Sequence, residues 1–436
     1  MSIKKHLTLK HTDGKSTMST QESFFDVIIV GGGIVGATAA LRIAKETDLS
    51  VALIEASSHN TSFDDEAFDP RVVALSLESQ HILDNINAWQ AIIEQRICPY
   101  VGMQIWDGEG TGHIEFLSRD IHQDSLGAIV ENSVIINALN QQITYTPSIY
   151  HLRGVSINDI AVLNNGSATQ TTQLTTDEGQ QLHCSLAIAA DGSQSTLREL
   201  SHIKTREWSY GHTAIVTTVT TEKSHQFQAW QRFTQHGPLA FLPLTEHGGD
   251  SQRVSIVWSQ TQTRAEDTMQ LSDADFCMQL GREFEYRLGN IKHTGQRFAI
   301  PLVQRHAKYY VKPGIALIGD AAHAIHPLAG QGVNLGLYDA DVLSAEIIRA
   351  HQRRVPLNHL SILNRYQRQR MPHNLAAMAA MEGFKRLFGA DNLATRWLRN
   401  QGMHTVNAQG WLKKILSSTA AGSYNTHHHI TRRASS

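Results

Sequence analysis

The sequence predicts an α/β protein: a doubly wound, mainly parallel sheet that binds a nucleotide, with a mainly antiparallel sheet inserted into it. Three observations predict this fold. Residues 24–30 form a short apolar, β-branched run, followed by a glycine-rich turn, an alanine-rich helical segment and a second strand over 50–55. Residues 186–190 and 314–318 are further apolar runs typical of buried parallel strands. Residues 210–301 are strand-rich and more polar, as in antiparallel sheets.

Composition narrows the class of protein. The chain has 436 residues, which is too long for one compact core, and 38 Lys and Arg against 40 Asp and Glu give a formal charge of −2. This balance excludes a chain-wide basic field, so we expect no nucleic-acid partner. Cys98, Cys184 and Cys277 are dispersed without CxxC spacing, so we expect a reduced, intracellular protein without a metal site. Residues 1–23 lack the apolar core of a secretory signal, and residues 27–41 are too short to span a bilayer.

The glycine-rich turn has the spacing of a dinucleotide-binding motif. Gly31 permits the tight turn, Gly33 lets a pyrophosphate approach the backbone, and Gly36 allows the helix to pack against the strand. The free N–H groups at the start of that helix favour phosphate. Glu55 ends the second strand, where a carboxylate accepts hydrogen bonds from an adenosine ribose. NAD and FAD both satisfy this pattern.

A second motif decides between the two cofactors. Gly319 and Asp320 end a buried strand, and Asp320 can bind the hydroxyls of a ribityl chain. Pro327 then fixes an extended turn, and Gly330 and Gly332 open a helix whose N-terminus suits the negative charge of a reduced flavin. NAD has no group that needs this second site, so the sequence favours FAD.

These motifs, together with Asp191 and Gly192 after the strand at 186–190, resemble the group A single-component flavin-dependent aromatic hydroxylases. Over about residues 24–416 the chain is similar to the ubiquinone-biosynthesis hydroxylases, the UbiH, UbiF and VisC group. The segments closest to this group are DPRVVAL (69–75), MQIWDG (103–108), VENS (130–133) and LAGQGVNLG (328–336). The implied fold is the Rossmann-like FAD-binding type of glutathione reductase and p-hydroxybenzoate hydroxylase.

The resemblance assigns roles to individual residues. It implies that Glu55 holds the adenosine ribose, that Arg71 contacts FAD, and that Asp191 lies near the pyrophosphate and takes part in NAD(P)H use. It also implies that Asp320 binds the ribityl chain and that the segment from Pro327 flanks the isoalloxazine. The residues predicted to bind the cofactor are Gly31, Gly33, Gly36, Glu55, Arg71, Asp191, Gly192, Gly319, Asp320, Pro327, Gly330, Gln331, Gly332 and Asn334.

The implied reaction is hydroxylation of the aromatic ring of a polyprenylated phenol in ubiquinone biosynthesis. NAD(P)H, a transient co-substrate, reduces FAD, and O₂ then forms a flavin C4a-hydroperoxide that transfers one oxygen. His323, His326 and Pro327 lie beside the flavin loop and are the candidate catalytic residues, although a histidine that only hydrogen-bonds the loop explains its position equally well. The alternatives are a hydroxylase of another aromatic compound and a non-catalytic, FAD-stabilised subunit of a ubiquinone-biosynthesis complex.

Membrane contact and assembly stay open at this stage. Residues 371–388 place Met and Phe at helical spacing, which suits either an ordinary core face or an apolar path for a prenyl chain. We expect a cytoplasmic protein, with peripheral contact to the inner face of the membrane and homo-oligomerisation both open. The expected divisions are a disordered extension (1–23), a discontinuous FAD-binding domain (24–90, 126–200 and 297–350), a substrate domain (91–125 and 201–296), a C-terminal helical region (351–416) and a disordered tail (417–436).

Overall fold

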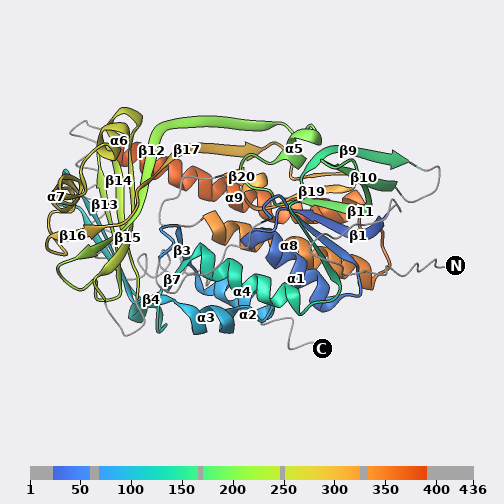
Figure 1. Cartoon of the computed structure of the whole chain (residues 1–436), viewed down its shortest axis with the longest axis horizontal. Helices are drawn as coiled ribbons and strands as arrows, with labels where there is room; N and C mark the ends of the chain where they lie inside the picture. The colour runs from blue at the N-terminus through green and yellow to red at the C-terminus, as the bar shows by residue number, and fades with distance from the viewer. Residues whose placement is uncertain (1–22, 59–67, 165–169, 246–250, 325–331, 390–436) are drawn as a thin grey trace.

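The computed structural model describes residues 23–58, 68–164, 170–245, 251–324 and 332–389. Two large sheets lie at opposite ends of the molecule, and a long two-stranded ribbon and a long helix run between them (Figure 1). Residues 1–22 of the expected extension, the expected tail and the flavin-loop residues 325–331 fall outside the described residues. Ser23, expected in the extension, is instead the first residue of a strand.

The first sheet is the predicted nucleotide-binding sheet. Its central strands pair in parallel because their apolar, β-branched residues are buried on both faces. The four predicted strands are confirmed, and the sheet has a fifth parallel strand, at 149–153, that was not predicted. The strand order is β18 (Val311–Lys312), β19 (Ile315–Leu317), β11 (Gln181–Ala189), β1 (Ser23–Val30), β2 (Val51–Glu55) and β8 (Ile149–Arg153), and the hairpin of β9 (Ile157–Asn164) and β10 (Gln170–Thr176) pairs with β11.

Helices cover one face of this sheet. α1 (Ile34–Glu46) follows the glycine-rich turn and packs between α4 (Asn132–Thr144) and α8 (Gly332–Gln352) (Figure 1). Alanines on α1 and α8 allow the two helices to pack closely. α4 begins at Asn132, directly after residues 130 and 131, which complete the preceding strand. The shorter helices are α2 (Leu77–Asn85), α3 (Trp89–Gln95) and α5 (Thr196–Leu200).

The second sheet contains the predicted antiparallel strands. Its outer face packs on α6 (Gln262–Met269) and α7 (Asp273–Glu283) around a core of aromatic side chains that includes Phe241, Phe276 and Phe284. All of its pairs are antiparallel except β13 with β5. The strand order is β20 (His323–Ala324), β17 (Phe298–Ala307), β12 (Thr205–Thr221), β15 (Arg253–Thr261), β14 (Gly237–Pro243), β13 (Gln228–Thr234), β5 (Gly102–Asp107) and β6 (His113–Leu117), with β16 (Ile291–Thr294) beside β12.

A ribbon of β12 and β17 connects the two halves (Figure 1). We keep the division into FAD-binding and substrate domains as a proposal with one change. Residues 298–307, expected in the FAD-binding domain, pair with β12 in the second sheet. A further small sheet, β3 (Val72–Leu75), β7 (Gly127–Glu131) and β4 (Cys98–Tyr100), lies between the two large sheets, and two 3-10 turns span Ser118–Ile121 (η1) and Gly319–Ala321 (η2).

The apolar strip at 371–388 belongs to α9 (Leu360–Gly389), which runs from the first sheet toward the second. Met371 packs on the main core, Met378 is buried, and Met381 joins the cluster around Phe233. Leu375 is instead 46% exposed, so the strip is only in part a core face. The side chains of residues 384 and 388 lie outside the described part of the structure.

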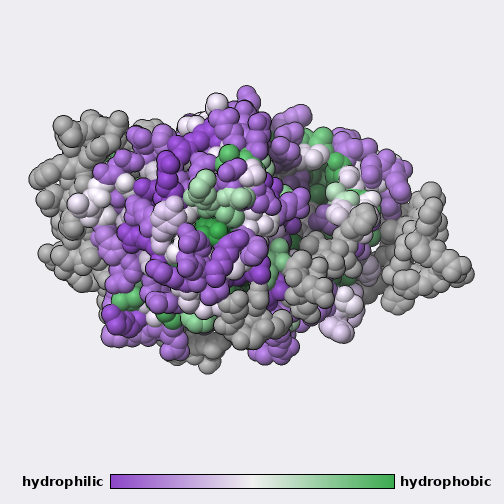
Figure 2. Space-filling view, turned by 60° about the vertical axis from the view of Figure 1, so that its left-hand side comes forward, coloured by the Kyte–Doolittle hydropathy of each residue, from purple (hydrophilic) through white to green (hydrophobic). Residues whose placement is uncertain are grey.

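The surface is mainly hydrophilic on the face that Figure 2 shows, where apolar residues form small separate patches. Within the ranges that the structure describes, no helix has both the length and the apolar character needed to cross a bilayer.

Candidate functional site

The glycine-rich turn at the end of β1 has the geometry that close approach of a phosphate requires. Gly31 has φ +108°, and a Cβ atom there would overlap the backbone oxygen of Ala190. A Cβ atom on Gly36 would overlap the backbone oxygen of Gly31, so these two glycines are needed for packing. Gly33 differs, because none of the described atoms lies within 4 Å of the position its Cβ would take. Gly33 therefore faces open space.

The start of α1 is suited to an anion. Gly33 caps this helix, and among the residues that the structure describes no side-chain cap hydrogen bond occupies its first N–H groups. Glu55 lies beside the turn: its Oε2 accepts the Gly32 N–H at 2.8 Å, and its Oε1 accepts the Ser57 N–H at 3.0 Å. Each carboxylate oxygen keeps a second lone pair, so Glu55 can order the turn and still accept a ribose hydroxyl.

The predicted Asp-Gly pair lies against the same turn. A Cβ atom on Gly31 would be 2.7 Å from the backbone nitrogen of Asp191, which brings the two motifs into contact. Asp191 Oδ2 accepts the Leu197 N–H at 3.1 Å, whereas its buried Oδ1 has no hydrogen-bond partner among the described residues. Burial raises the pKa of Asp191, against hydrogen bonds that lower it. Gly192 follows with open space around it.

The Gly319–Asp320 loop lies against the start of α1. A Cβ atom on Gly319 would lie 3.2 Å from Val35, and one on Gly336 of α8 would lie 2.6 Å from the same valine. The Asp320 side chain is exposed to solvent. The protein around it still desolvates the carboxylate, and this desolvation is the main factor that raises its pKa. Its accessible carboxylate can therefore accept hydrogen bonds from ligand hydroxyls.

His323, the first candidate catalytic residue, is 1% exposed. Its Nε2 donates a hydrogen bond of 2.5 Å to the buried Asp339, and its Nδ1 has no partner among the described residues. This arrangement supports the alternative in which the histidine fixes the loop. His326 and Pro327, the other candidates, lie outside the described residues, as do Gly330 and Gln331.

Asn334 and Arg71 differ in how they are held. Asn334 is buried near the start of α8, where its Oδ1 accepts from Ser76 N and Ser79 Oγ and its Nδ2 donates to Ala74 O. These bonds anchor α8 to the segment after β3, so we assign Asn334 to the framework. Arg71 keeps 60% of its side chain exposed and pairs with Asp69, which leaves it accessible to a ligand. Gly332 is the first residue of α8.

Sequence reasoning missed the buried ion pairs that hold these loops. Arg96 and Glu131 form a two-point pair at 2.6 and 3.0 Å, and Glu131 Oε2 also accepts the Asp69 N–H at 2.7 Å. Arg198 is 1% exposed and contacts both cofactor loops. Glu131 lies in the VENS segment, to which no role was assigned, and Arg96 and Arg198 belong to no motif that we singled out. The only available signal was a charged residue within or next to an apolar run, as in the AIVE segment ending at Glu131.

These features together fit FAD. The fold brings three motifs, which are spread over about 300 residues of chain, to one end of the parallel sheet. There they provide open space above Gly33, an uncapped helix N-terminus, an unpartnered oxygen on Asp191 and an accessible carboxylate on Asp320. An anionic dinucleotide with a polyhydroxyl chain needs this combination.

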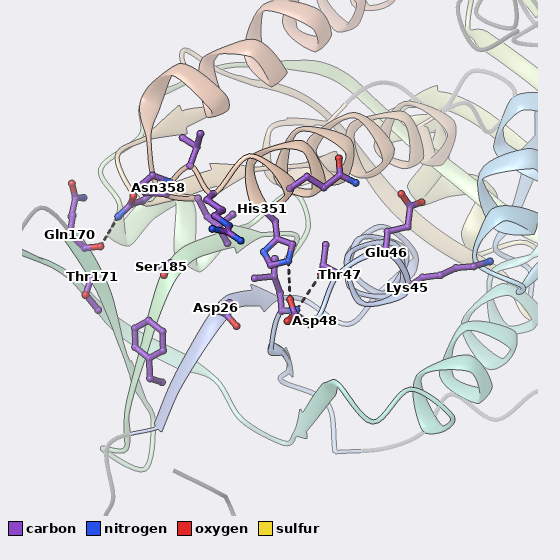
Figure 3. A pocket seen from close by; sticks show the side chains of 17 residues that line it. Asp26, Lys45, Glu46, Thr47, Asp48, Gln170, Thr171, Ser185, His351 and Asn358 are labelled. Atoms are coloured by element: carbon purple, nitrogen blue, oxygen red, sulfur yellow. Dashed lines mark hydrogen bonds and ion pairs between the residues drawn. The ribbon is translucent and has the colours of Figure 1, made fainter. Parts of the chain in front are cut away.

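A separate cavity of about 1100 Å³ lies at the opposite end of α1 (Figure 3). Its lining combines polar and charged side chains with apolar ones such as Phe24 and Leu357, and His351 pairs with Asp48 across it at 2.8 Å. Asn358 donates to the backbone of Gln170 at 2.6 Å on another wall. None of the predicted cofactor residues is among the described residues that line it, so this cavity is distinct from the flavin site.

No group of metal ligands is present in the described part of the chain. Cys98, Cys184 and Cys277 are free and buried, and burial raises the pKa of each thiol. These thiols are thus neither paired nor poised as nucleophiles.

Comparison with known proteins identifies the family. Residues 25–381 match the FAD binding domain family. The chain is 32% identical to the ubiquinone biosynthesis monooxygenase COQ6, mitochondrial, of Xenopus tropicalis, over 95% of this chain and 97% of that protein. It is 33% identical to the 3-demethoxyubiquinol 3-hydroxylase of Escherichia coli, over 91% of this chain and 98% of that protein.

Solved structures share the fold. PqsL of Pseudomonas aeruginosa, in complex with 2-aminobenzoylacetate, superposes with a TM-score of 0.73 over 88% of this chain and all of its own, at 19% identity. The p-nitrophenol 4-monooxygenase PnpA of Pseudomonas putida superposes with a TM-score of 0.72 over 91% of this chain and 97% of its own, at 17% identity. The chain therefore belongs to the FAD-binding domain family. It is a FAD-dependent aromatic-ring monooxygenase.

Proposed function

We propose that the substrate is a polyprenylated phenol of ubiquinone biosynthesis, hydroxylated on its ring with NAD(P)H and O₂. The observation that carries this proposal is the match to two ring hydroxylases of that pathway over more than 90% of each chain. The convergence of the three predicted cofactor motifs at one end of the parallel sheet supports it. FAD, when bound, supplies the chemistry that activates oxygen.

We assign the binding and positioning steps to residues of this chain. The turn from Gly31 to Gly36 and the N-terminus of α1 hold the pyrophosphate, and Glu55 accepts from the adenosine ribose. Asp320 holds the ribityl hydroxyls, and Asp191 lies by the pyrophosphate. The aligned dipole of α8 stabilises negative charge that develops next to its N-terminus. The second sheet covers the reacting ring and limits access of water.

A polyprenyl chain partitions into the bilayer because it is apolar. The enzyme must therefore meet this substrate at a membrane surface, and we place it peripherally on the inner face of the cytoplasmic membrane. The name of the COQ6 relative places that protein in ubiquinone biosynthesis. This supports the proposal that the present enzyme works together with other enzymes of the pathway.

Anaerobic reduction of the bound flavin tests the proposal. Purified protein is mixed with NADPH, then NADH, with and without a prenylated phenol, while the visible flavin bands are followed. Faster bleaching in the presence of the phenol, and a hydroxylated product after O₂ is admitted, is the expected result. The matched control is the same phenol without its hydroxyl group. Bound flavin that neither nucleotide reduces would favour a partner reductase or the non-catalytic assembly role.

A further inference from the structure

Asp339 of α8 lies at the centre of a buried polar network directly beneath the Gly319–Asp320 loop. Its side chain is fully buried, and both carboxylate oxygens are saturated with donors. Oδ2 accepts from the backbone N–H of Gly319 at 3.1 Å and from His323 Nε2 at 2.5 Å. Oδ1 accepts from Arg370 Nε at 2.8 Å and from Asn374 Nδ2 at 3.1 Å.

The two donors on Oδ2 lie on either side of Asp320 in the chain. Gly319 precedes it by one residue and His323 follows it by three, so a single oxygen fixes both ends of the segment that presents the Asp320 carboxylate. Asp320 itself makes no hydrogen bond to another described residue, and its side chain is exposed. Its position is thus set by its neighbours and not by its own contacts.

The two donors on Oδ1 come from α9. Arg370 also donates to Asn374 Oδ1 at 2.8 Å, and Asn374 Nδ2 lies 3.3 Å from the hydroxyl of Tyr310, which contacts His306 at 3.1 Å. Burial alone would raise the pKa of Asp339, but the charges of His323 and Arg370 outweigh it and hold the value at about 2. The carboxylate is therefore ionised, and its charge makes these hydrogen bonds strong.

We propose that Asp339 is a positioning residue for the cofactor: through Gly319 and His323 it sets the Asp320 carboxylate for the ribityl chain, and Arg370 and Asn374 of α9 hold Asp339 in place. This inference rests on the proposed role of Asp320 in binding FAD. It gives α9 a function at the flavin site although α9 carries none of the predicted cofactor residues. It also gives His323 a role through Asp339 and not through contact with the substrate.

FAD titration of the refolded apoprotein tests the proposal through flavin fluorescence and the visible spectrum of the bound flavin. In Asp339→Asn one oxygen becomes an NH₂ group facing donors, so we expect the dissociation constant for FAD to rise about 10-fold or more, with a shifted spectrum at saturating FAD. Tyr366→Phe is the matched control: it removes the 2.7 Å hydrogen bond from α9 to Leu317, keeps the aromatic ring that packs on Tyr310, and removes none of the hydrogen bonds of the network. It should change the dissociation constant less than about 2-fold and leave the spectrum unchanged.

Two further variants make every outcome decisive. Should Asp339→Asn fail to fold, Asn374→Ala removes one donor from Oδ1 and is expected to weaken FAD binding about 3-fold or more. A folded Asp339→Asn, or an Asn374→Ala, with the wild-type dissociation constant and spectrum would overturn the proposal. Asp320→Ala separates the two hypotheses. Unchanged FAD affinity in Asp320→Ala refutes the assignment of the loop itself, whereas its loss beside a normal Asp339→Asn refutes only the positioning role.

Discussion

Arg198 donates from one nitrogen, Nη1, to the backbone oxygen of Ala321 at 3.0 Å. The same nitrogen donates to the backbone oxygen of Ser193 at 3.1 Å, so one buried guanidinium holds together two loops whose acceptor residues, Ser193 and Ala321, are 128 residues apart in the chain. These are the loops that carry Asp191 and Asp320.

Replacement of Arg198 by methionine should therefore separate the two loops. We expect weaker FAD binding and a lower free energy of unfolding, by about 1–3 kcal/mol, because two backbone oxygens lose a charged donor. Arg198→Lys, which keeps the charge without the fork, should recover only part of the loss. Denaturant unfolding and FAD titration measure the two effects, and equal values for wild type and Arg198→Met would contradict the linkage.

Gly33 and Gly36 should respond differently to the same substitution. Gly33→Val places its side chain in open space, so the apoprotein should unfold at nearly the wild-type temperature yet bind no FAD. Gly36→Val should instead lower the melting temperature strongly, because its Cβ overlaps the Gly31 backbone. Thermal unfolding of both apoproteins, with flavin content after purification, checks this. Full flavin occupancy in Gly33→Val would remove Gly33 from the pyrophosphate site.

Glu55→Ala should weaken FAD binding without altering the ring chemistry. The variant loses the acceptor for the ribose and also the hydrogen bond to Gly32, together about 1.5–3 kcal/mol of binding free energy. Glu55→Gln keeps an acceptor oxygen for either the ribose or the Gly32 N–H, so its affinity for FAD should lie between those of the wild type and Glu55→Ala. The ratio of hydroxylated product to oxidised NAD(P)H at saturating FAD is the readout that should stay constant.

Breaking the ion pair between Arg96 and Glu131 should strongly lower the free energy of unfolding. Arg96→Met leaves a buried carboxylate with only the Asp69 N–H, and we expect a loss of about 3–5 kcal/mol in the free energy of unfolding. The double variant Arg96→Met with Glu131→Leu should be less destabilised than Arg96→Met alone, because it leaves no unpaired charge. Urea denaturation of the wild type, Arg96→Met, Glu131→Leu and the double variant gives the comparison, and simple additivity of the two single effects would rule out a coupled pair.

Because His306 is buried, we expect the free energy of unfolding to fall in mild acid. Burial, assisted by the charges of His323 and Arg206, lowers its pKa from 6.5 to about 4, so the folded state keeps it neutral where the unfolded state is protonated. Unfolding then binds a proton, and stability falls as the pH drops from about 6.5 toward 4, by up to about 3 kcal/mol. His306→Gln should flatten this part of the stability profile, whereas the exposed His293→Gln should not.

Local features were predictable from the sequence, and contacts between distant segments were not. The parallel strands and the motif glycines follow from short patterns, because apolar β-branched runs and glycine spacing carry their own signal. The strand at 149–153 escaped prediction because its residues, IYHLR, are only partly apolar. Asp339 lies on α8, and Arg370 and Asn374 lie 31 and 35 residues later on α9. No local pattern links the three residues, and only the fold shows that they share one site.

The strand order also constrains how the chain matures during synthesis. β1 pairs with β11, which is made about 160 residues later, and β11 then pairs with β19, which follows after more than 120 further residues. The hydrogen-bond network around Asp339 cannot be completed until residue 374 has been synthesised. The nucleotide-binding half therefore cannot be completed before nearly seven-eighths of the chain has been translated. Such non-local pairing folds slowly and leaves apolar strands exposed meanwhile, which makes the nascent chain dependent on protection from aggregation.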